Sequence, residues 1–136
     1  MKYYLAKSEP STYSIDDLER DRKTLWDGVK NAQALQAIRL MVEGDCVLFY
    51  HSQGISAIVG WGFVEGPVGS EPNDPKLATF TLRFGGKLAV PVSLSQIKAT
   101  EKFADFALVR QSRLSTMVVP ASFVAWLKKV SQDFKP

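Results

Sequence analysis

The segment "CVLFYHSQGISAIVGWGFV", residues 46–64, predicts two adjacent β-strands. Its first half is dense in apolar and aromatic side chains, and its second half alternates large side chains with glycine. Gln53-Gly54 lies between the halves and predicts the turn of a hairpin. Gly60 and Gly62 fall on one face of the second strand and leave a bare strip, which suits either a bend in a barrel or the close approach of a ligand.

Further strands and one loop are predicted on either side of this hairpin. Residues 2–7 form a first strand, and "LATFTLRF", residues 77–84, resumes the strand alternation after the hairpin. Gly85-Gly86 is expected to turn the chain from there into "LAVPV", residues 88–92. Residues 66–76 are rich in proline, glycine and acidic residues and predict a loop.

Four helices are predicted from their caps and apolar faces. Capping boxes, in which two polar side chains three residues apart satisfy free backbone amides, are expected at Ser14–Asp17 and Ser93–Gln96. Asn31 can cap a helix whose inward residues are Ala34, Leu35, Ile38 and Met41. Pro120 precedes a final helix with inward Phe123, Val124, Trp126, Leu127 and Val130. Short strands with helices in the connections predict one α+β domain, residues 1–136, built on a small curved sheet or barrel.

Composition leaves several classes of partner open. The net charge of +3 permits an anionic partner such as nucleic acid without demanding one. The single cysteine, Cys46, allows no intrachain disulfide, so a reducing compartment, cytoplasm or nucleus, is expected. The chain has no apolar run of membrane-spanning length and no signal-peptide pattern at its start, so no membrane partner is expected.

Catalysis and metal binding have little support in the residues. One histidine and one cysteine cannot make a typical zinc site, and no metal or other cofactor is expected. Cys46 and His51 are five residues apart on a strand and should point to opposite faces. A triad of His51 with Ser52 or Ser115 lacks the G-x-S-x-G pattern, and glycine-rich phosphate loops are absent.

Trp26 is the residue with the least obvious place. It stands directly before Asp27-Gly28, which reads as a tight turn, and shortly before the helix cap at Asn31. Either the indole plugs the end of a small core, or it is a platform on which a planar ring stacks. Polar side chains suited to reading the edge of such a ring are Ser8, Asn31, His51, Ser52, Arg113 and Ser115.

Each of these residues also has a purely structural interpretation. Trp26 can pack in the core, as is expected for Trp61 and Trp126, which fall on apolar faces at the right period. Asn31 can simply cap a helix, and His51 can end a strand with a satisfied hydrogen bond. Arg113 can pair with a surface carboxylate.

At these residues the sequence resembles the EVE domain family of the PUA-like superfamily. The resemblance rests on "YYLAKSEPSTYSIDDL", "WDGVKNAQALQAIRLMVEGDCVLFYHS", "IVGWGFV", "PVSL" and "SRLS", in that order, and runs from about Tyr3 to the final helix. It implies a PUA-like β pseudo-barrel, a curved and mainly antiparallel sheet of about five or six strands with short flanking helices. It also implies a pocket beside the sheet for a modified base such as methylated or hydroxymethylated cytosine. The residues that it assigns to this pocket are Lys7, Ser8, Glu9, Trp26, Asn31, Tyr50, His51, Ser52, Arg113, Leu114 and Ser115.

The sequence departs from the family pattern near the pocket. Tyr3-Tyr4 replaces the usual aromatic-tryptophan start, Lys30 replaces an arginine, and Leu35-Gln36 replaces Arg-Asn. Ala32 stands where the family carries tyrosine. If that ring frames the pocket, Ala32 predicts a ligand that is larger, differently shaped or more weakly held. The lost arginines lower the attraction for a phosphate backbone.

The leading hypothesis is a non-enzymatic module that reads a modified base in DNA or RNA, with a monomer as the default state. The bases read, the polymer and the pathway stay open. One alternative is a sensor of a free nucleoside or metabolite. Another is a hydrolase or base-modifying enzyme that uses His51 with Asp27 or Glu9, although Asp27 before Gly28 is typical of a turn. The expected location is the cytoplasm in a bacterium or the nucleus in a eukaryote.

Overall fold

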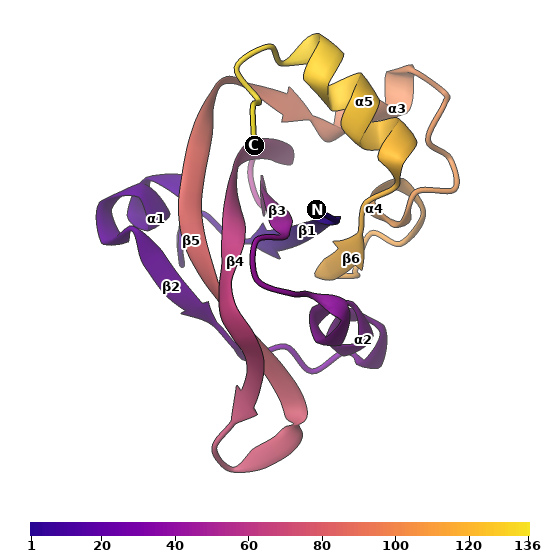
Figure 1. Ribbon diagram of the computed structural model, residues 1–136. Helices are drawn as coiled ribbons and strands as arrows, with labels where there is room; N and C mark the ends of the chain where they lie inside the picture. The colour runs from indigo at the N-terminus through magenta and orange to yellow at the C-terminus, as the bar shows by residue number, and fades with distance from the viewer.

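A computed structural model describes all residues, 1–136, and contains one six-stranded sheet with five short helices (Figure 1). The strands follow one another across the sheet in the order β2-β5-β4-β3-β1-β6. Only β1 and β3 pair in parallel, so the sheet is mainly antiparallel, and it does not close. The strands are β1 Tyr3–Ser8, β2 Lys23–Trp26, β3 Cys46–His51, β4 Ala57–Glu71, β5 Asp74–Ser93 and β6 Thr116–Val118. The helices are α1 Ile15–Asp21, α2 Ala32–Leu40, α3 Leu94–Ala99, α4 Ala107–Arg110 and α5 Ala121–Val130.

The β3–β4 hairpin and the glycines on one face of β4 are confirmed. Other parts of the protein occupy the space beside these glycines. A Cβ atom on Gly60 would lie 2.5 Å from the carbonyl oxygen of Gly86 and 2.7 Å from Cδ1 of Ile15. The β4–β5 register also shifts around Gly60 and Gly62, as it does where a strand bends sharply. The glycines therefore serve the bend of the sheet and the packing of α1, and not the approach of a ligand.

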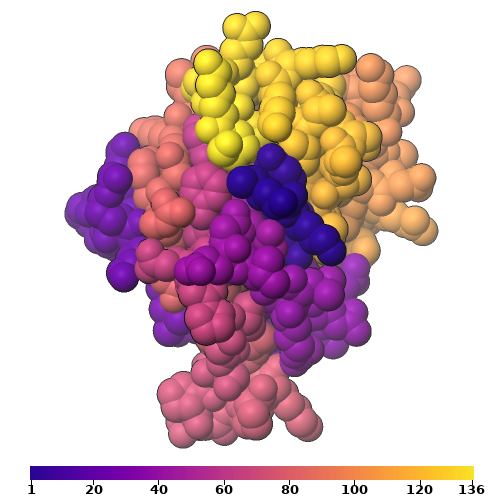
Figure 2. Space-filling view, viewed as in Figure 1, coloured from indigo at the N-terminus to yellow at the C-terminus, as the bar shows by residue number.

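The loop predicted for residues 66–76 is wrong. Strands β4 and β5 continue through this segment as a projecting two-stranded ribbon, and only Pro72-Asn73 forms the turn (Figures 1 and 2). A register shift between Glu65 and Gly69 takes the intervening residues out of the ladder. Proline and glycine are tolerated there because a bulge needs no regular ladder hydrogen bonds.

The turn predicted at Gly85-Gly86 is also wrong, because β5 runs through both residues without a break. The two glycines make room for a large side chain on β4. A Cβ atom on Gly85 would lie 2.6 Å from Cδ1 of Trp61, and one on Gly86 would collide with the benzene ring of the same indole. Trp61 is buried, as predicted.

The predicted helix caps are confirmed, with one exception in detail. Ser14 and Asp17 form the reciprocal capping box of α1, and the Asn31 side chain accepts a hydrogen bond from the Ala34 amide. Ser93 accepts from the Gln96 amide, but the return bond from the Gln96 side chain is absent. Strands β2 and β6 and helix α4 were not predicted.

The inward face predicted for α5 is right for Phe123, Val124 and Leu127, which are buried, and Trp126 is half-buried against Phe103 and Phe123. It is wrong for Val130, which is 43% exposed. The last turn of α5 runs past the core, and Val130 lies beside the exposed Val90 in a shallow surface cavity.

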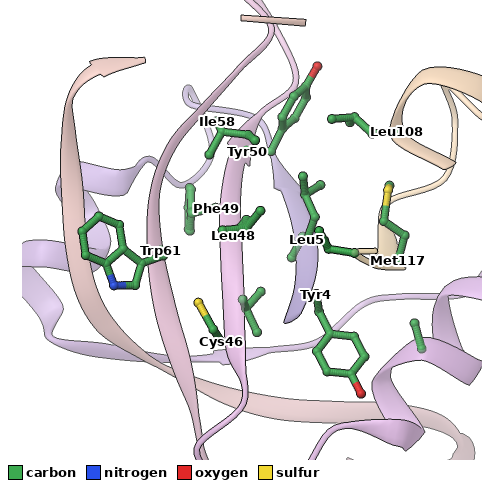
Figure 3. Packing of buried hydrophobic residues seen from close by; sticks show 14 of the residues in the cluster. Tyr4, Leu5, Cys46, Leu48, Phe49, Tyr50, Ile58, Trp61, Leu108 and Met117 are labelled. Atoms are coloured by element: carbon green, nitrogen blue, oxygen red, sulfur yellow. The ribbon is translucent and has the colours of Figure 1, made fainter. Parts of the chain in front are cut away.

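The core is a single cluster of 37 buried apolar residues on both sides of the central strands. Figure 3 shows Phe49 and Tyr50 on opposite sides of β3, as the strand alternation predicts. Cys46 is fully buried in this cluster, and burial raises the pKa of its thiol to about 12. A thiol with this pKa is protonated at neutral pH and is no nucleophile. None of the helices has the length and apolar character needed to span a bilayer.

Candidate functional site

A cavity of about 470 Å³ opens between the end of β1, the segment that leads into α1, and the edge strand β2. Four of the predicted site residues lie in its wall. The fold brings them together because β1 and β2 both end here, although β2 is one edge of the sheet and β1 is second from the opposite edge. The lining residues are Lys7, Ser8, Glu9, Thr12, Tyr13, Thr24, Leu25, Trp26 and Asp27.

Trp26 combines the two interpretations that its sequence position left open. It ends β2 opposite Phe80 of β5, and its indole stacks on the Phe80 ring at 5.8 Å with an interplanar angle of 20°. The edge contact with Phe49 fixes it further, at 5.6 Å and 88°. The indole remains half-buried and lines the cavity. Trp26 is therefore a rigid side chain that is anchored in the core and also available to a ligand.

Lys7 brings a positive charge to the same wall. Its Nζ donates to the carbonyl oxygen of Ser112 at 2.9 Å and lies 5.7 Å from the centroid of the Tyr50 ring. No carboxylate pairs with it, and burial lowers the pKa of its ammonium group. The loss of water around this ammonium strengthens any hydrogen bond that it gives to a ligand.

The segment between β1 and α1 is held in place by its own hydrogen bonds. The carbonyl oxygen of Glu9 accepts from the amides of Thr12 and Tyr13, at 2.9 Å each. Ser8 Oγ donates to the carbonyl oxygen of Tyr13 at 2.6 Å, and the Tyr13 hydroxyl donates to Asp21 Oδ2 at 2.9 Å. The cavity is thus bounded by two aromatic rings, those of Tyr13 and Trp26, on fixed backbone.

His51 lies behind this wall and not in it. Its Nε2 accepts the amide N–H of Ile15, the first residue of α1, at 3.1 Å. The interpretation of His51 as a strand-end histidine with a satisfied hydrogen bond is confirmed. Burial lowers the pKa of the imidazole, the nearby Lys87 lowers it further, and Asp16 opposes both. His51 therefore anchors α1 in its neutral form.

This contact predicts a loss of stability in mild acid. Because the pKa of His51 is lower in the folded chain than its ordinary value of 6.5, the unfolded chain binds more protons below that pH. The free energy of unfolding should therefore be fully retained above about pH 6.5 and fall as the pH drops toward the folded-state pKa. Thermal melts between pH 7.5 and 5.5 measure this effect. His51→Gln keeps an acceptor for Ile15 without a titrating group and should flatten the profile; equal slopes in both proteins would contradict this role.

Seven predicted site residues do not line the cavity. Asn31 is exposed as the cap of α2, Leu114 is buried in the core, and Arg113 is exposed without an ion pair. The others support the wall from behind. Lys7 N–H donates to the carbonyl oxygen of Ser115, Ser52 N–H donates to that of Ser8, and the buried Tyr50 lies under Lys7. His51 holds α1, as described above.

Five lining residues were missed as site residues. Thr12 and Tyr13 stand inside the quoted "SEPSTYS" motif, which pointed to the right segment. Thr24 and Leu25 belong to β2, which has too short an apolar pattern to be predicted. Asp27 was considered only as a turn former or a catalytic base. Ala32, Lys30 and Gln36, where the sequence departs from the family pattern, are exposed and lie outside the lining.

The model of the EVE domain family matches residues 2–130. The chain belongs to the EVE domain family. Protein Rpa0253 from Rhodopseudomonas palustris has the same fold, with a TM-score of 0.91 and 31% identity over 100% of this chain and 97% of that one. PUA-like architecture, the fold class expected from the sequence, is thereby confirmed.

Two further EVE relatives are thymocyte nuclear proteins. Rat thymocyte nuclear protein 1 is 43% identical over 61 residues, which is 37% of this chain and 27% of the relative. The match thus spans well under half the length of that protein. The structure of human THYN1 in complex with DNA that contains 5-methylcytosine superimposes with a TM-score of 0.86 at 22% identity and covers 100% of both chains. At that identity the likeness shows the shared fold.

Proposed function

We propose that this EVE chain is a non-enzymatic module that binds nucleic acid and reads a modified base, such as a modified cytosine. The observation that carries the proposal is the Trp26 indole, which is fixed by Phe80 and Phe49 and faces a cavity of about 470 Å³. Stacking on such a ring is worth roughly 1–3 kcal/mol per base. The human relative bound to DNA with 5-methylcytosine supports the same class of ligand here.

Basic side chains near the cavity supply the contacts to phosphate in this proposal. The turn that carries Arg113 is joined to Lys7 through the Ser112 carbonyl, so the exposed guanidinium lies on a segment fixed to the cavity wall. Lys30 lies in the segment between β2 and α2, where the turn expected at Asp27-Gly28 is not formed. It is also exposed without an ion pair. Contacts of this kind position the backbone, while the cavity reads an extruded or single-stranded base.

The arrangement around His51 supports binding over catalysis. A general base needs a free lone pair within reach of the substrate, and Nε2 already accepts from Ile15. His51 is also outside the lining that holds Glu9 and Asp27. We place the protein in the cytoplasm of a bacterium or the nucleus of a eukaryote, acting as a single EVE unit of residues 1–136.

Binding to short labelled oligonucleotides at several salt concentrations tests the proposal. DNA and RNA, single- and double-stranded, are offered unmodified and with methylated or hydroxymethylated cytosine or methylated adenine. We expect affinity that depends on the modification and falls as salt is raised, because polymer binding releases counterions. Binding of free nucleosides with an affinity that does not change with salt concentration would favour the small-molecule sensor. Turnover of the oligonucleotide by the wild type, lost in His51→Ala, would favour the enzyme.

A further inference from the structure

Some polar groups that line the cavity already form hydrogen bonds within the protein, whereas others are free to bind a ligand. Ser8 donates its only hydroxyl proton to the Tyr13 carbonyl. The Tyr13 hydroxyl donates to Asp21. Lys7 gives one of its three protons to Ser112, so two remain. Two hydroxyl donors at the wall, those of Ser8 and Tyr13, are therefore already used within the protein.

Two lining carboxylates, by contrast, have no partner in the protein. Glu9 and Asp27 make no side-chain hydrogen bond and no ion pair, although several other carboxylates of the chain do. The charged side chains of the lining are these two acids and Lys7, with a net charge of −1. An anionic group is therefore repelled from the cavity. The favoured ligand edge offers N–H donors to the carboxylates and a carbonyl acceptor to Lys7.

We propose that Glu9 and Asp27 are specificity-determining residues that accept the exocyclic amino group of cytosine, while Lys7 donates to its ring carbonyl. This inference rests on the proposed function. Aspartate and glutamate pair with the cytosine amino group because a carboxylate only accepts, and that amino group only donates. Thymine carries a carbonyl oxygen at the same ring position. This carbonyl oxygen would face the carboxylate oxygens, and because both groups only accept hydrogen bonds, no hydrogen bond could form between them.

The two bases 5-methylcytosine and thymine make a matched test, because they share the methyl group. They differ only at this position and at the neighbouring ring nitrogen N3, which carries a proton in thymine alone. Cytosine and uracil repeat the comparison without the methyl group. Each base is placed once in the same DNA sequence, single-stranded or opposite an abasic site, so that no base pair contributes. We expect the wild-type protein to prefer the amino-bearing base of each pair by roughly tenfold or more, since one well-made base contact discriminates on that scale.

Glu9→Gln, Asp27→Asn and the double substitution should reduce this preference, with the largest loss in the double variant. The ratio of affinities is the readout, since removal of a negative charge also strengthens binding to any polyanion. Glu19→Gln is the matched control, because Glu19 is exposed on α1, outside the cavity lining, and its loss changes the charge equally. All of these side chains are exposed, and thermal melts confirm that the variants fold.

The possible outcomes distinguish a failure of this inference from a failure of the proposed function on which it rests. Tight binding of both 5-methylcytosine and thymine, with no preference for the amino group, would overturn the role of the carboxylates and leave the base reader in place. The same holds for a preference that survives the double substitution. Failure to bind any of the four bases would overturn the proposed function and this inference together.

Discussion

Trp26→Ala should weaken binding to a modified-base oligonucleotide by roughly ten- to 100-fold, the loss expected when one base–aromatic stack is removed. The reason is geometric. Phe80 and Phe49 hold the indole before the ligand arrives, so stacking requires little additional ordering. The same contacts mean that the substitution also costs stability, by about 2 kcal/mol for a half-buried tryptophan. We therefore expect a folded variant with a lower melting temperature.

Trp126→Ala is the matched control for this loss. Trp126 is likewise half-buried, packs against Phe103 and Phe123, and is absent from the cavity lining. It should lose a similar amount of stability and keep its affinity. Fluorescence-anisotropy titrations at fixed salt, with melts of both variants, make the comparison. Unchanged binding by a folded Trp26→Ala protein would remove Trp26 from the site and return it to a purely structural role.

Gly60→Ala should destabilise the chain by about 3 kcal/mol or prevent folding altogether, which is a large cost for one methyl group. The new Cβ atom would lie 2.5 Å from the Gly86 carbonyl oxygen and 2.7 Å from the Ile15 side chain. The first of these is backbone and has little room to move. Separation of β4 from β5 or displacement of α1 would be needed, and α1 carries the His51 contact behind the cavity.

Gly69→Ala provides the comparison on the same strand. Its Cβ atom would meet only the Thr79 hydroxyl, at 3.3 Å, on the projecting ribbon, and we expect a change of well under 1 kcal/mol. Urea unfolding of the two variants measures the difference. A Gly60→Ala protein as stable as the wild type would mean that β4 and β5 tolerate more separation than their pairing suggests.

Local sequence chemistry predicted the parts of the fold that are decided locally. The β3–β4 hairpin, the capping box at Ser14 and the cap at Asn31 each depend on neighbours within a few residues, and each is confirmed. Gly85-Gly86 was misread because the reason for these glycines is Trp61, a residue on another strand. Strands β2 and β6 are short, and their pairing with β5 and β1 defines them more than their own side chains do.

The candidate site shows the same contrast between features decided by neighbouring residues and features decided by distant contacts. Lys7, Ser8, Glu9 and Trp26 were placed in the cavity through the family resemblance, and the structure puts all four in its wall. Composition alone stopped at a set of polar residues, because whether His51 faces a ligand or Ile15 depends on where α1 packs. The base-binding role of the wall stays a prediction that the titrations above test.

The position of β1 between β3 and β6 affects how the protein is made. Strand β1 is synthesised before both of its partners, and β6, which pairs with Tyr4 through Val118, comes more than a hundred residues later. Until then one edge of β1 has no partner, and unpaired edges invite aggregation. Ser112 and Ser115, whose carbonyl oxygens accept hydrogen bonds from Lys7, are synthesised equally late. The wall of the cavity is therefore fully supported only after Ser115 has been synthesised, and folding that depends on such distant contacts is slow.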